Sequence, residues 1–235
     1  MRLIKKKTLH EEIVETLRDM IMTGELKEGE KINENELCVS MGISKTPLRE
    51  ALRVLSAEKI IKLVPNKGSY VSKPTIKEIK EMFDVMSVLE GICARTATEK
   101  MTDNDYIRVE QFHEKLEENF QRRDQKNYIK FNNLYHTFLQ KLAGNETCNQ
   151  IINGLRQKIL LYRFKSLNLP GRFEKSIQEH RQLLKIFRDR DPEKAEILIK
   201  AHLKNQSDAV EKLSQPIIGE TQQEISQNRA SANDR

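Results

Sequence analysis

The sequence predicts a mostly α-helical protein: an N-terminal winged helix-turn-helix (three helices plus a two-stranded wing) followed by an all-helical bundle. Residues 33–73 contain two short helical segments joined by a tight turn, then two short strands. From Thr75 onward, apolar residues repeat at helical spacing and no strand-period stretch occurs. Only 9 Gly and 6 Pro occur among 235 residues, which suits long helices. The length allows two modest domains.

The first helix is expected from Leu9 to Met22 and should end at Thr23-Gly24. A second helix is expected after Asn33, whose side chain suits an N-cap, and Gly42 supplies the sharp turn that follows it. The apolar face of the first helix consists of Leu9, Ile13, Leu17, Met20 and Ile21.

The third helix begins after Ser44, its expected N-cap, with Pro47 in the first turn, where a missing N–H costs nothing. One face carries an apolar stripe and another a basic stripe. The apolar stripe is Leu48, Ala51, Leu52 and Leu55, and the basic stripe is Lys45, Arg49 and Arg53. Strands are expected over Ile60–Val64 and Ser69–Ser72, with the turn at residues 65–68.

Pro74 marks the expected domain boundary, which gives a winged domain over residues 1–73, a helical domain over 74–214 and a flexible tail over 215–235. The helical domain should form a bundle. Its six helices are expected near residues 75–100, 103–122, 124–143, 146–167, 172–189 and 192–213.

Composition narrows the class of protein. The net charge of +6 suits a polyanionic partner, although 35 acidic residues accompany 41 Lys and Arg, so ordinary surface charge is the alternative. The three cysteines are scattered, without a CxxC pair, which favours a reducing cytoplasm over a disulfide framework. The basic N-terminus lacks the apolar region of a signal peptide, and no apolar run is long enough to span a membrane.

The basic stripe of the third helix suits a helix that lies in the major groove of double-stranded DNA. Arg49 can donate two parallel hydrogen bonds to guanine, and Lys45, one turn earlier, can reach phosphate or a guanine edge. Ser44 and Thr46 lie at the helix N-terminus, where hydroxyl and amide groups bind phosphate. The alternatives are a solvated basic face and a wing that contacts protein.

Residues 8–73 resemble the winged helix-turn-helix of the GntR family of bacterial transcription regulators. The matching segments are residues 21–26 (IMTGEL), Gly29, Glu36-Leu37, residues 41–52 (MGISKTPLREAL) and residues 65–71 (PNKGSYV). The resemblance implies that Asn66, Lys67 and Gly68 form a wing tip that approaches the minor groove. Family members often carry Arg at the positions of Asn35 and Lys45, so contact there is retained but bidentate recognition is weakened.

Residues 75–213 resemble the all-helical FCD ligand-binding domain of the FadR-type branch. The matching segments are residues 131–139 (FNNLYHTFL), 143–145 (AGN), 171–172 (GR), 176–184 (SIQEHRQLL), 190–195 (RDPEKA) and 201–203 (AHL). In many members three His and one carboxylate hold a divalent metal.

The resemblance places these ligands at His136, His180 and His202, with Asn132 in the place of the carboxylate. Three neutral imidazoles suit zinc, with nickel as an alternative. Because an amide is a poorer ligand than a carboxylate, either metal affinity falls or Asn132 only orients a bound water. Histidines satisfied by nearby carbonyls are the alternative; His10 and His113 are expected at the surface.

The resemblance further implies that the helical domain binds a small carboxylate. Family members often carry Arg near the position of Met86 to hold this effector. Arg163 or Arg172 are candidates to replace it, with surface salt bridges as the alternative for both.

The sequence therefore predicts a homodimeric, effector-controlled transcription regulator, by default a repressor, whose two heads read a short palindromic operator. One alternative is a metal-free sensor of a larger ligand, such as an acyl-CoA. Another is a metal-dependent enzyme fused to a DNA-binding head, but no HExxH, GxSxG or Gly-rich phosphate loop occurs, so the prediction is that the protein is not an enzyme.

Overall fold

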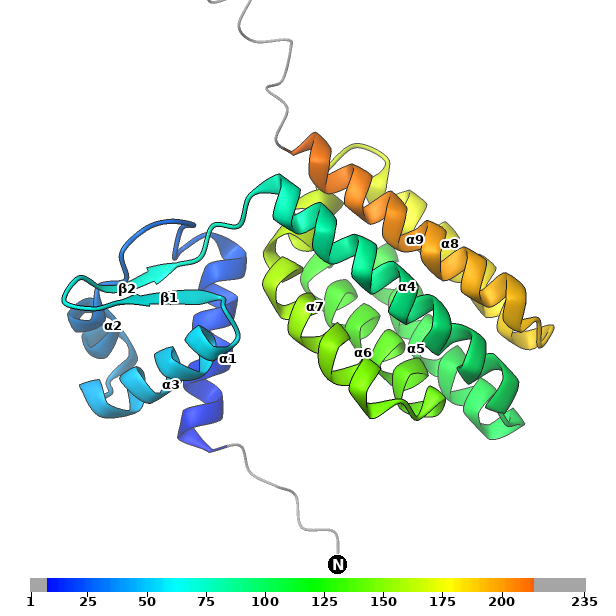
Figure 1. Cartoon of the computed structure of the whole chain (residues 1–235), viewed down its shortest axis with the longest axis horizontal. Coiled ribbons are helices and arrows are strands. Elements are labelled where there is room, and N and C mark those ends of the chain that lie inside the picture. The colour runs from blue at the N-terminus through cyan, green and yellow to red at the C-terminus, as the bar shows by residue number, and fades with distance from the viewer. Residues whose placement is uncertain (1–7, 214–235) are drawn as a thin grey trace, which may run out of the picture.

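The computed structural model describes residues 8–213, and its two parts lie side by side (Figure 1). The N-terminal part, here called the head, contains three helices and a two-stranded wing. The C-terminal part, here called the bundle, contains six helices. Both parts match the predicted fold class. The predicted tail, residues 215–235, lies outside the described residues.

The head forms a small core from all three of its helices and the wing. Its elements are α1 (Leu9–Thr23), α2 (Glu34–Met41), α3 (Lys45–Ala57), β1 (Ile61–Val64) and β2 (Gly68–Val71). The strands pair antiparallel, with Ile61 opposite Val71 and Val64 opposite Gly68. Every member of the predicted apolar stripe of α3 is buried.

The turn between α2 and α3 depends on Gly42, which adopts φ +63°, a conformation that glycine reaches without strain. Asn33 caps α2 as expected, because its side chain accepts hydrogen bonds from the amides of residues 35 and 36. Ser44 occupies the N-cap position of α3, but its hydroxyl makes no capping hydrogen bond. The Ser44 hydroxyl therefore contributes nothing to holding this helix end.

The six helices of the bundle begin and end within one residue of their predicted limits. They are α4 (Ile76–Lys100), α5 (Asp103–Gln121), α6 (Gln125–Ala143), α7 (Glu146–Leu167), α8 (Arg172–Arg188) and α9 (Pro192–Lys212). Helix α9 runs back along α4, its most extensive partner (Figure 1). None of the helices within residues 8–213 is both long enough and apolar enough to cross a membrane.

Helix α7 joins the bundle to the head. Leu161 is buried and packs into the hydrophobic core of the head. Next to it, the Tyr162 hydroxyl donates a hydrogen bond to Glu28, and Lys165 pairs with the same carboxylate. The head is therefore held against the bundle by apolar and polar contacts of α7, and Lys126 at the start of α6 adds an ion pair with Asp19 of α1 at 2.9 Å.

We predict that Leu161→Ala destabilises the head by about 2 kcal/mol, because the substitution removes a buried leucine from its core. Thermal and denaturant unfolding would measure the loss. Ile107→Ala is the matched control, because Ile107 lies in the bundle on α5, outside the contact with the head, and is 48% exposed. Equal stability of the two variants would contradict the role of Leu161.

Candidate DNA-reading face and candidate metal centre

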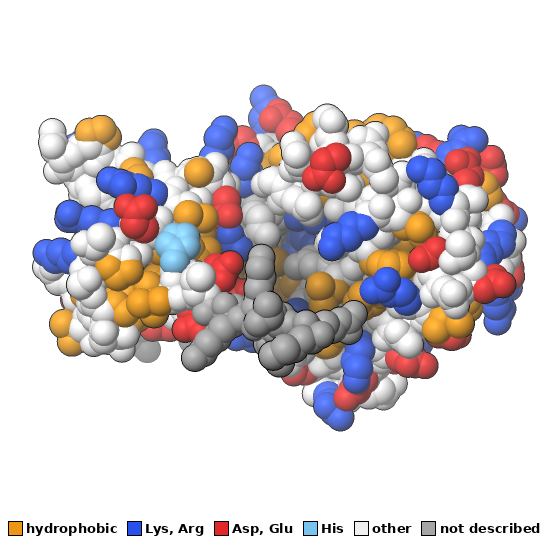
Figure 2. All heavy atoms as spheres, turned by 90° about the horizontal axis from the view of Figure 1, so that it is seen from below, with side chains coloured by type: hydrophobic (Ala, Val, Ile, Leu, Met, Phe, Trp, Pro, Cys, Tyr) orange, Lys and Arg blue, Asp and Glu red, His pale blue; other side chains and the backbone are white. Residues whose placement is uncertain are grey.

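Helix α3 turns its basic stripe outward. Lys45, Arg49 and Arg53 are exposed, while the opposite face of the helix fills the core of the head. Lys and Arg side chains also lie along the outer end of the head, away from the bundle (Figure 2). This arrangement leaves the basic side chains accessible to a polyanion.

A groove of about 510 Å³ separates α3 from the wing. Arg49 and Arg53 line it from the helix, and Asn66 and Gly68 line it from the wing tip. Both wing residues have positive φ, +59° for Asn66 and +103° for Gly68, so a tight turn brings the tip beside the helix. The structure thus brings together residues that the sequence predicted separately on helix and wing.

One acidic residue, Glu34, binds side chains of both α3 and the wing on this face. Its carboxylate accepts a hydrogen bond from Nε of Arg49 at 2.9 Å and one from the Ser69 hydroxyl at 3.4 Å. Glu34 therefore links α2, α3 and the wing, and it orients Arg49. Sequence reasoning missed it, because helical periodicity alone does not show which residue of α2 faces Arg49.

Three histidines from three helices meet inside the bundle. His136 lies on α6, His180 on α8 and His202 on α9, and all three are buried. One ring nitrogen of each lies within 4.8 Å of the others. The predicted triad is therefore a single buried cluster.

The surroundings fix the tautomer of each imidazole. Nδ1 of His136 lies 3.0 Å from the Glu90 carboxylate, and Nδ1 of His202 lies 2.6 Å from the Glu179 carboxylate. Nδ1 of His180 lies 2.8 Å from the carbonyl of Ser176. Each Nδ1 thus carries the hydrogen and donates a hydrogen bond to its acceptor, which leaves each Nε2 with a lone pair that can accept a hydrogen bond or bind a metal.

Two side-chain amides contact the cluster. The amide nitrogen of Asn132 lies 3.0 Å from Nε2 of His180, and that of Gln206 lies 2.5 Å from Nε2 of His202. The Asn132 oxygen accepts a hydrogen bond of 2.6 Å from Arg163 instead of facing the cluster. Nε2 of His136 is buried and has no hydrogen-bond partner among the described residues.

The imidazoles are held in the neutral form that metal binding requires. Burial lowers the pKa of His136 to about 3, with a further contribution from Arg156. Burial also places the pKa of His180 well below its usual value and lowers the pKa of His202. The cluster therefore offers three neutral nitrogen donors at pH 7.

Two carboxylates support the cluster from outside. Burial disfavours ionised Glu90, but Arg156 and His136 outweigh that effect and hold the pKa of Glu90 well below its usual value. Arg156 binds Glu90 through two nitrogens, one of them at 2.8 Å. Glu179 likewise has a lowered pKa, because its contacts with His202 and Arg172 outweigh burial.

This donor set fits a divalent metal. Three neutral imidazoles, each oriented through its other nitrogen by a carboxylate or carbonyl, form the arrangement that proteins use for zinc and neighbouring late first-row ions. The unpartnered Nε2 of His136 is the atom of the cluster that lacks any other role.

Arg163 and Arg172 are both buried, so the interpretation of these residues as surface salt-bridge partners is wrong. They line a cavity of about 10 Å³ beside Asn132 and Gln206, which has room for one water molecule. Arg172 contacts the Glu179 carboxylate at 3.4 Å. Arg163 instead binds only amide oxygens, those of Asn132, Asn133 and Gln206.

Arg163 is thus a buried cation with no carboxylate within 4 Å among residues 8–213. Burial, with Arg156 nearby, lowers the pKa of Arg163 to about 9, which still leaves the guanidinium charged at neutral pH. Glu90 offsets part of this charge from a distance, but no carboxylate contacts the guanidinium, so a bound anion would lower the cost of burying it.

Sequence reasoning missed Glu90, although a signal was present. Glu90 follows Phe83 and Met86 at helical spacing, so it occupies a core position of α4, where a carboxylate is rare without a partner.

The prediction that His113 lies at the surface was wrong: His113 is buried on α5, and its Nε2 lies 3.7 Å from Glu117. His10 is half-buried.

Comparison with known proteins identifies the family. Residues 9–71 match the family described as bacterial regulatory proteins, gntR family, and residues 81–205 match the FCD domain. The chain belongs to the GntR family. Its FCD domain places it in the FadR-type branch of these regulators, as the sequence predicted.

The curated relatives of this GntR-family chain are transcriptional regulators and not enzymes. An uncharacterized HTH-type transcriptional regulator of Bacillus subtilis, YdhC, is 25% identical over 79% of this chain and 84% of its own length. The gluconate operon transcriptional repressor of Bacillus licheniformis is 26% identical over 74% of each chain. The solved structure of McbR/YncC from E. coli shares the fold, with a TM-score of 0.76, 20% identity and coverage of 89% and 100%.

We predict that, once metal is removed, stability falls steeply between pH 6.5 and pH 5. The three histidines have folded pKa values below the ordinary 6.5, so below that pH the unfolded chain binds protons that the folded chain does not. The free energy of unfolding should drop by up to about 4 kcal/mol per pH unit. Denaturant unfolding at several pH values would measure this slope. His180→Gln should reduce the slope by the contribution of about one proton, because it removes one of the three histidines. An unchanged slope would contradict the assignment.

We also predict that Asn132→Asp raises zinc affinity about tenfold or more, because it adds a negative ligand beside His180. Competition with a chromogenic chelator would measure the affinity. Asn133→Asp is the matched control: it adds the same charge one residue away, next to Arg163 but outside the histidine cluster. An equal gain in both variants would show general electrostatics instead of ligation.

Proposed function

We propose that this protein is a cytoplasmic, homodimeric repressor whose bundle binds a small carboxylate beside a divalent metal, most suitably zinc, and whose heads bind a short palindromic operator. The family establishes DNA binding through the head and effector binding through the FCD domain. The finer parts of the proposal rest on the geometry of the bundle, the basic face of α3 and the exposed face of α4.

The observation that carries the carboxylate assignment is Arg163. This buried guanidinium has three amide partners and no acidic one, and it lies on the same side of the bundle core as the histidine cluster, one residue, Asn132, away. A small acid could bind Arg163 through the two oxygens of its carboxylate and reach the histidine cluster at the same time. Arg172 lines the same cavity and would add a second positive charge.

We assign the metal to His136, His180 and His202, each through Nε2. Asn132 is proposed as a fourth, weaker ligand, which requires its amide to turn so that the oxygen leaves Arg163. The bound ion would supply positive charge and an open coordination position for the effector. The residues themselves orient the imidazoles, keep them neutral and exclude bulk water.

In the head, we assign base reading to Arg49, with Lys45 and Arg53 on the same stripe. Ser44 and Thr46 would bind phosphate at the N-terminus of α3, and the Ser44 hydroxyl, which caps nothing, suits this role. Asn35 would contact the backbone from α2, and the wing tip of Asn66, Lys67 and Gly68 would approach the minor groove.

An apolar stripe on the bundle supports the dimer. Val85, Val88 and Ile92 occupy one face of α4 and are 49%, 50% and 42% exposed, and Ile151 of the neighbouring α7 is 45% exposed. A second copy of the chain would cover this face, since isologous contacts bring the same patch of both subunits together. The two heads would then read two related half-sites.

The proposal favours a small effector over an acyl-CoA. The cavity beside Arg163 has room for about one water molecule in this state, so even a small acid requires side chains to move, and a long acyl chain requires far more.

We predict that Arg49→Ala lowers affinity for an operator selected in vitro with the wild-type protein by about 10- to 100-fold, the effect of losing one bidentate base contact. Fluorescence anisotropy against this DNA and against a scrambled duplex would separate specific from general binding. Arg188→Ala, which removes an exposed arginine from the last turn of α8, is the control. Full specificity in Arg49→Ala would refute the assignment.

We further predict that at least one of citrate, malate and gluconate raises the melting temperature of the zinc-loaded protein, and that Arg163→Gln abolishes this shift. Arg163→Lys should retain part of it, because the charge stays while the bidentate geometry is lost. A shift that survives in Arg163→Gln, or no shift with any of the three acids, would contradict the carboxylate site.

A further inference from the structure

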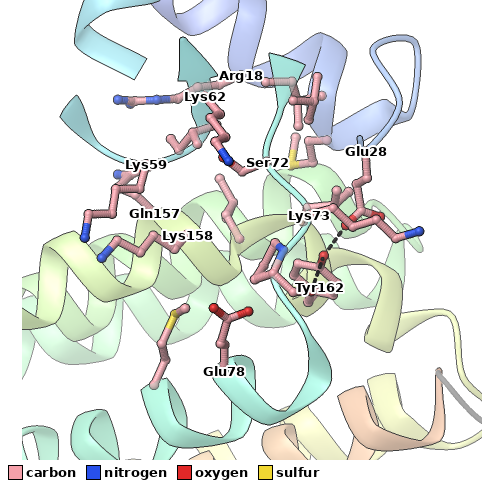
Figure 3. Close-up of a pocket in the computed structure, with 18 residues that line it drawn as sticks. Arg18, Glu28, Lys59, Lys62, Ser72, Lys73, Glu78, Gln157, Lys158 and Tyr162 are labelled. Carbon is pink, nitrogen blue, oxygen red and sulfur yellow. Dashed lines mark hydrogen bonds between the residues drawn. The ribbon is translucent and has the colours of Figure 1, made fainter. Parts of the chain in front are cut away.

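A second cavity, of about 380 Å³, lies between the head and the bundle (Figure 3). The head lines it with residues of α1, the loop before β1, and β1 itself, and the bundle lines it with residues of α4 and α7. Its volume falls within the range of small-molecule sites in proteins. It is separate from the Arg163 cavity, because Lys158 and Leu161 leave α7 on the face opposite Arg156 and Arg163.

Positive charge on the cavity wall is not neutralised. Lys59, Lys62 and Lys158 line it, and none has an acidic partner within 4 Å in the described part of the chain. Figure 3 shows Lys59 and Lys158 side by side, pointing in the same direction. Burial lowers the pKa of Lys158, and the charge of Lys59 lowers it further. These two cations therefore lie close together with nothing to balance them.

The acidic residues of the cavity are already engaged elsewhere. Glu28 accepts from the Tyr162 hydroxyl and pairs with Lys165, as the dashed contact in Figure 3 shows for Tyr162. Glu78 accepts hydrogen bonds from the backbone and hydroxyl of Thr75 at the start of α4. Neither carboxylate is left to neutralise the lysines.

The wall also carries polar atoms without partners. Nε of Arg18 and Oε1 of Gln157 are buried and have no hydrogen-bond partner among residues 8–213, although another nitrogen of Arg18 pairs with Glu58. Buried polar atoms are nearly always satisfied in folded proteins, and these two atoms lie behind the cavity surface, so a ligand would reach them only after a small movement of the side chains in front.

Apart from Ser72, Lys73 and Tyr162, the remaining lining is apolar. The apolar side chains come from both sides of the cavity: Ile21, Met22, Ile60, Val71, Pro74, Met82, Leu160 and Leu161. An inorganic ion would leave this surface uncovered, whereas a molecule with an apolar body would fill it. The cavity therefore combines an apolar floor with a cationic rim.

We propose that this cavity binds a small organic anion with an apolar body, with its charged group between Lys59 and Lys158. Such a ligand contacts the head through Lys59 and Ile60 and the bundle through Lys158 and Met82. The ligand stabilises the arrangement of head and bundle in which all four residues line the same cavity. The population of that arrangement rises in proportion to the ligand's preference for it over other head orientations. This site is independent of the metal and of the carboxylate assigned to Arg163.

The test uses 8-anilinonaphthalene-1-sulfonate, which carries one sulfonate on an aromatic body and fluoresces in apolar surroundings. Titration of the full chain should show one saturable site per chain. Lys59→Gln/Lys158→Gln should weaken binding about tenfold or more, since it removes both cations and leaves the apolar floor intact. Rising salt should weaken binding to the wild type more than to this double variant.

Lys141→Gln/Lys185→Gln is the matched control, because it removes two exposed lysines of α6 and α8 that also lack acidic partners among the described residues. It should bind the probe like the wild type, as should Arg163→Gln. No saturable binding, equal binding by Lys59→Gln/Lys158→Gln, or loss of binding in Arg163→Gln would each overturn the proposal. Circular dichroism of each variant would confirm that it is folded.

Discussion

The bundle is organised around the burial of charge. Its core contains two arginine–glutamate pairs, Arg156 with Glu90 and Arg172 with Glu179, and the unpaired Arg163. Charges in an apolar core are costly unless hydrogen bonds and opposite charges surround them. The carboxylates meet this need by accepting from Nδ1 of His136 and His202 as well as from the arginines. The same contacts orient the imidazoles, so the stability of the core and the geometry of the candidate metal centre have one origin.

Helix α7 connects this charged core to the head. Arg156 and Arg163 project from one face into the polar core, while Leu161 and Tyr162 contact the head from other faces of the same helix. A helix is stiff along its length, so the carboxylate proposed above would change the surface on which the head rests if it drew Arg163 toward the histidines. In this proposal, coupling between effector and DNA would need only a small rotation or shift of α7, which contacts both sites.

The sequence was a good guide to the fold because each helix carries a clear apolar stripe and a stop signal. Gly144 and the Asp191-Pro192 pair mark helix limits that the structure reproduces within one residue. The three histidines were found through family resemblance, not through spacing. The partners of these histidines were not found, since Glu90, Glu179 and Gln206 come from different helices: helical spacing can place Glu90 on the core face of α4, but only packing shows which histidine each partner meets. His113 was misplaced although the pattern contained a signal, because it shares the buried face of α5 with Val109 and Leu116 at helical spacing.

The central claim is that the buried histidine cluster holds a metal despite the amide at position 132. Elemental analysis of untagged protein, purified without chelator, tests it most directly. The account predicts about one zinc or nickel ion per chain in the native protein and its loss in His136→Ala/His180→Ala. Native protein without a divalent ion would contradict the account, and would show that the cluster is a hydrogen-bonded core in which Asn132 and Gln206 satisfy the imidazoles.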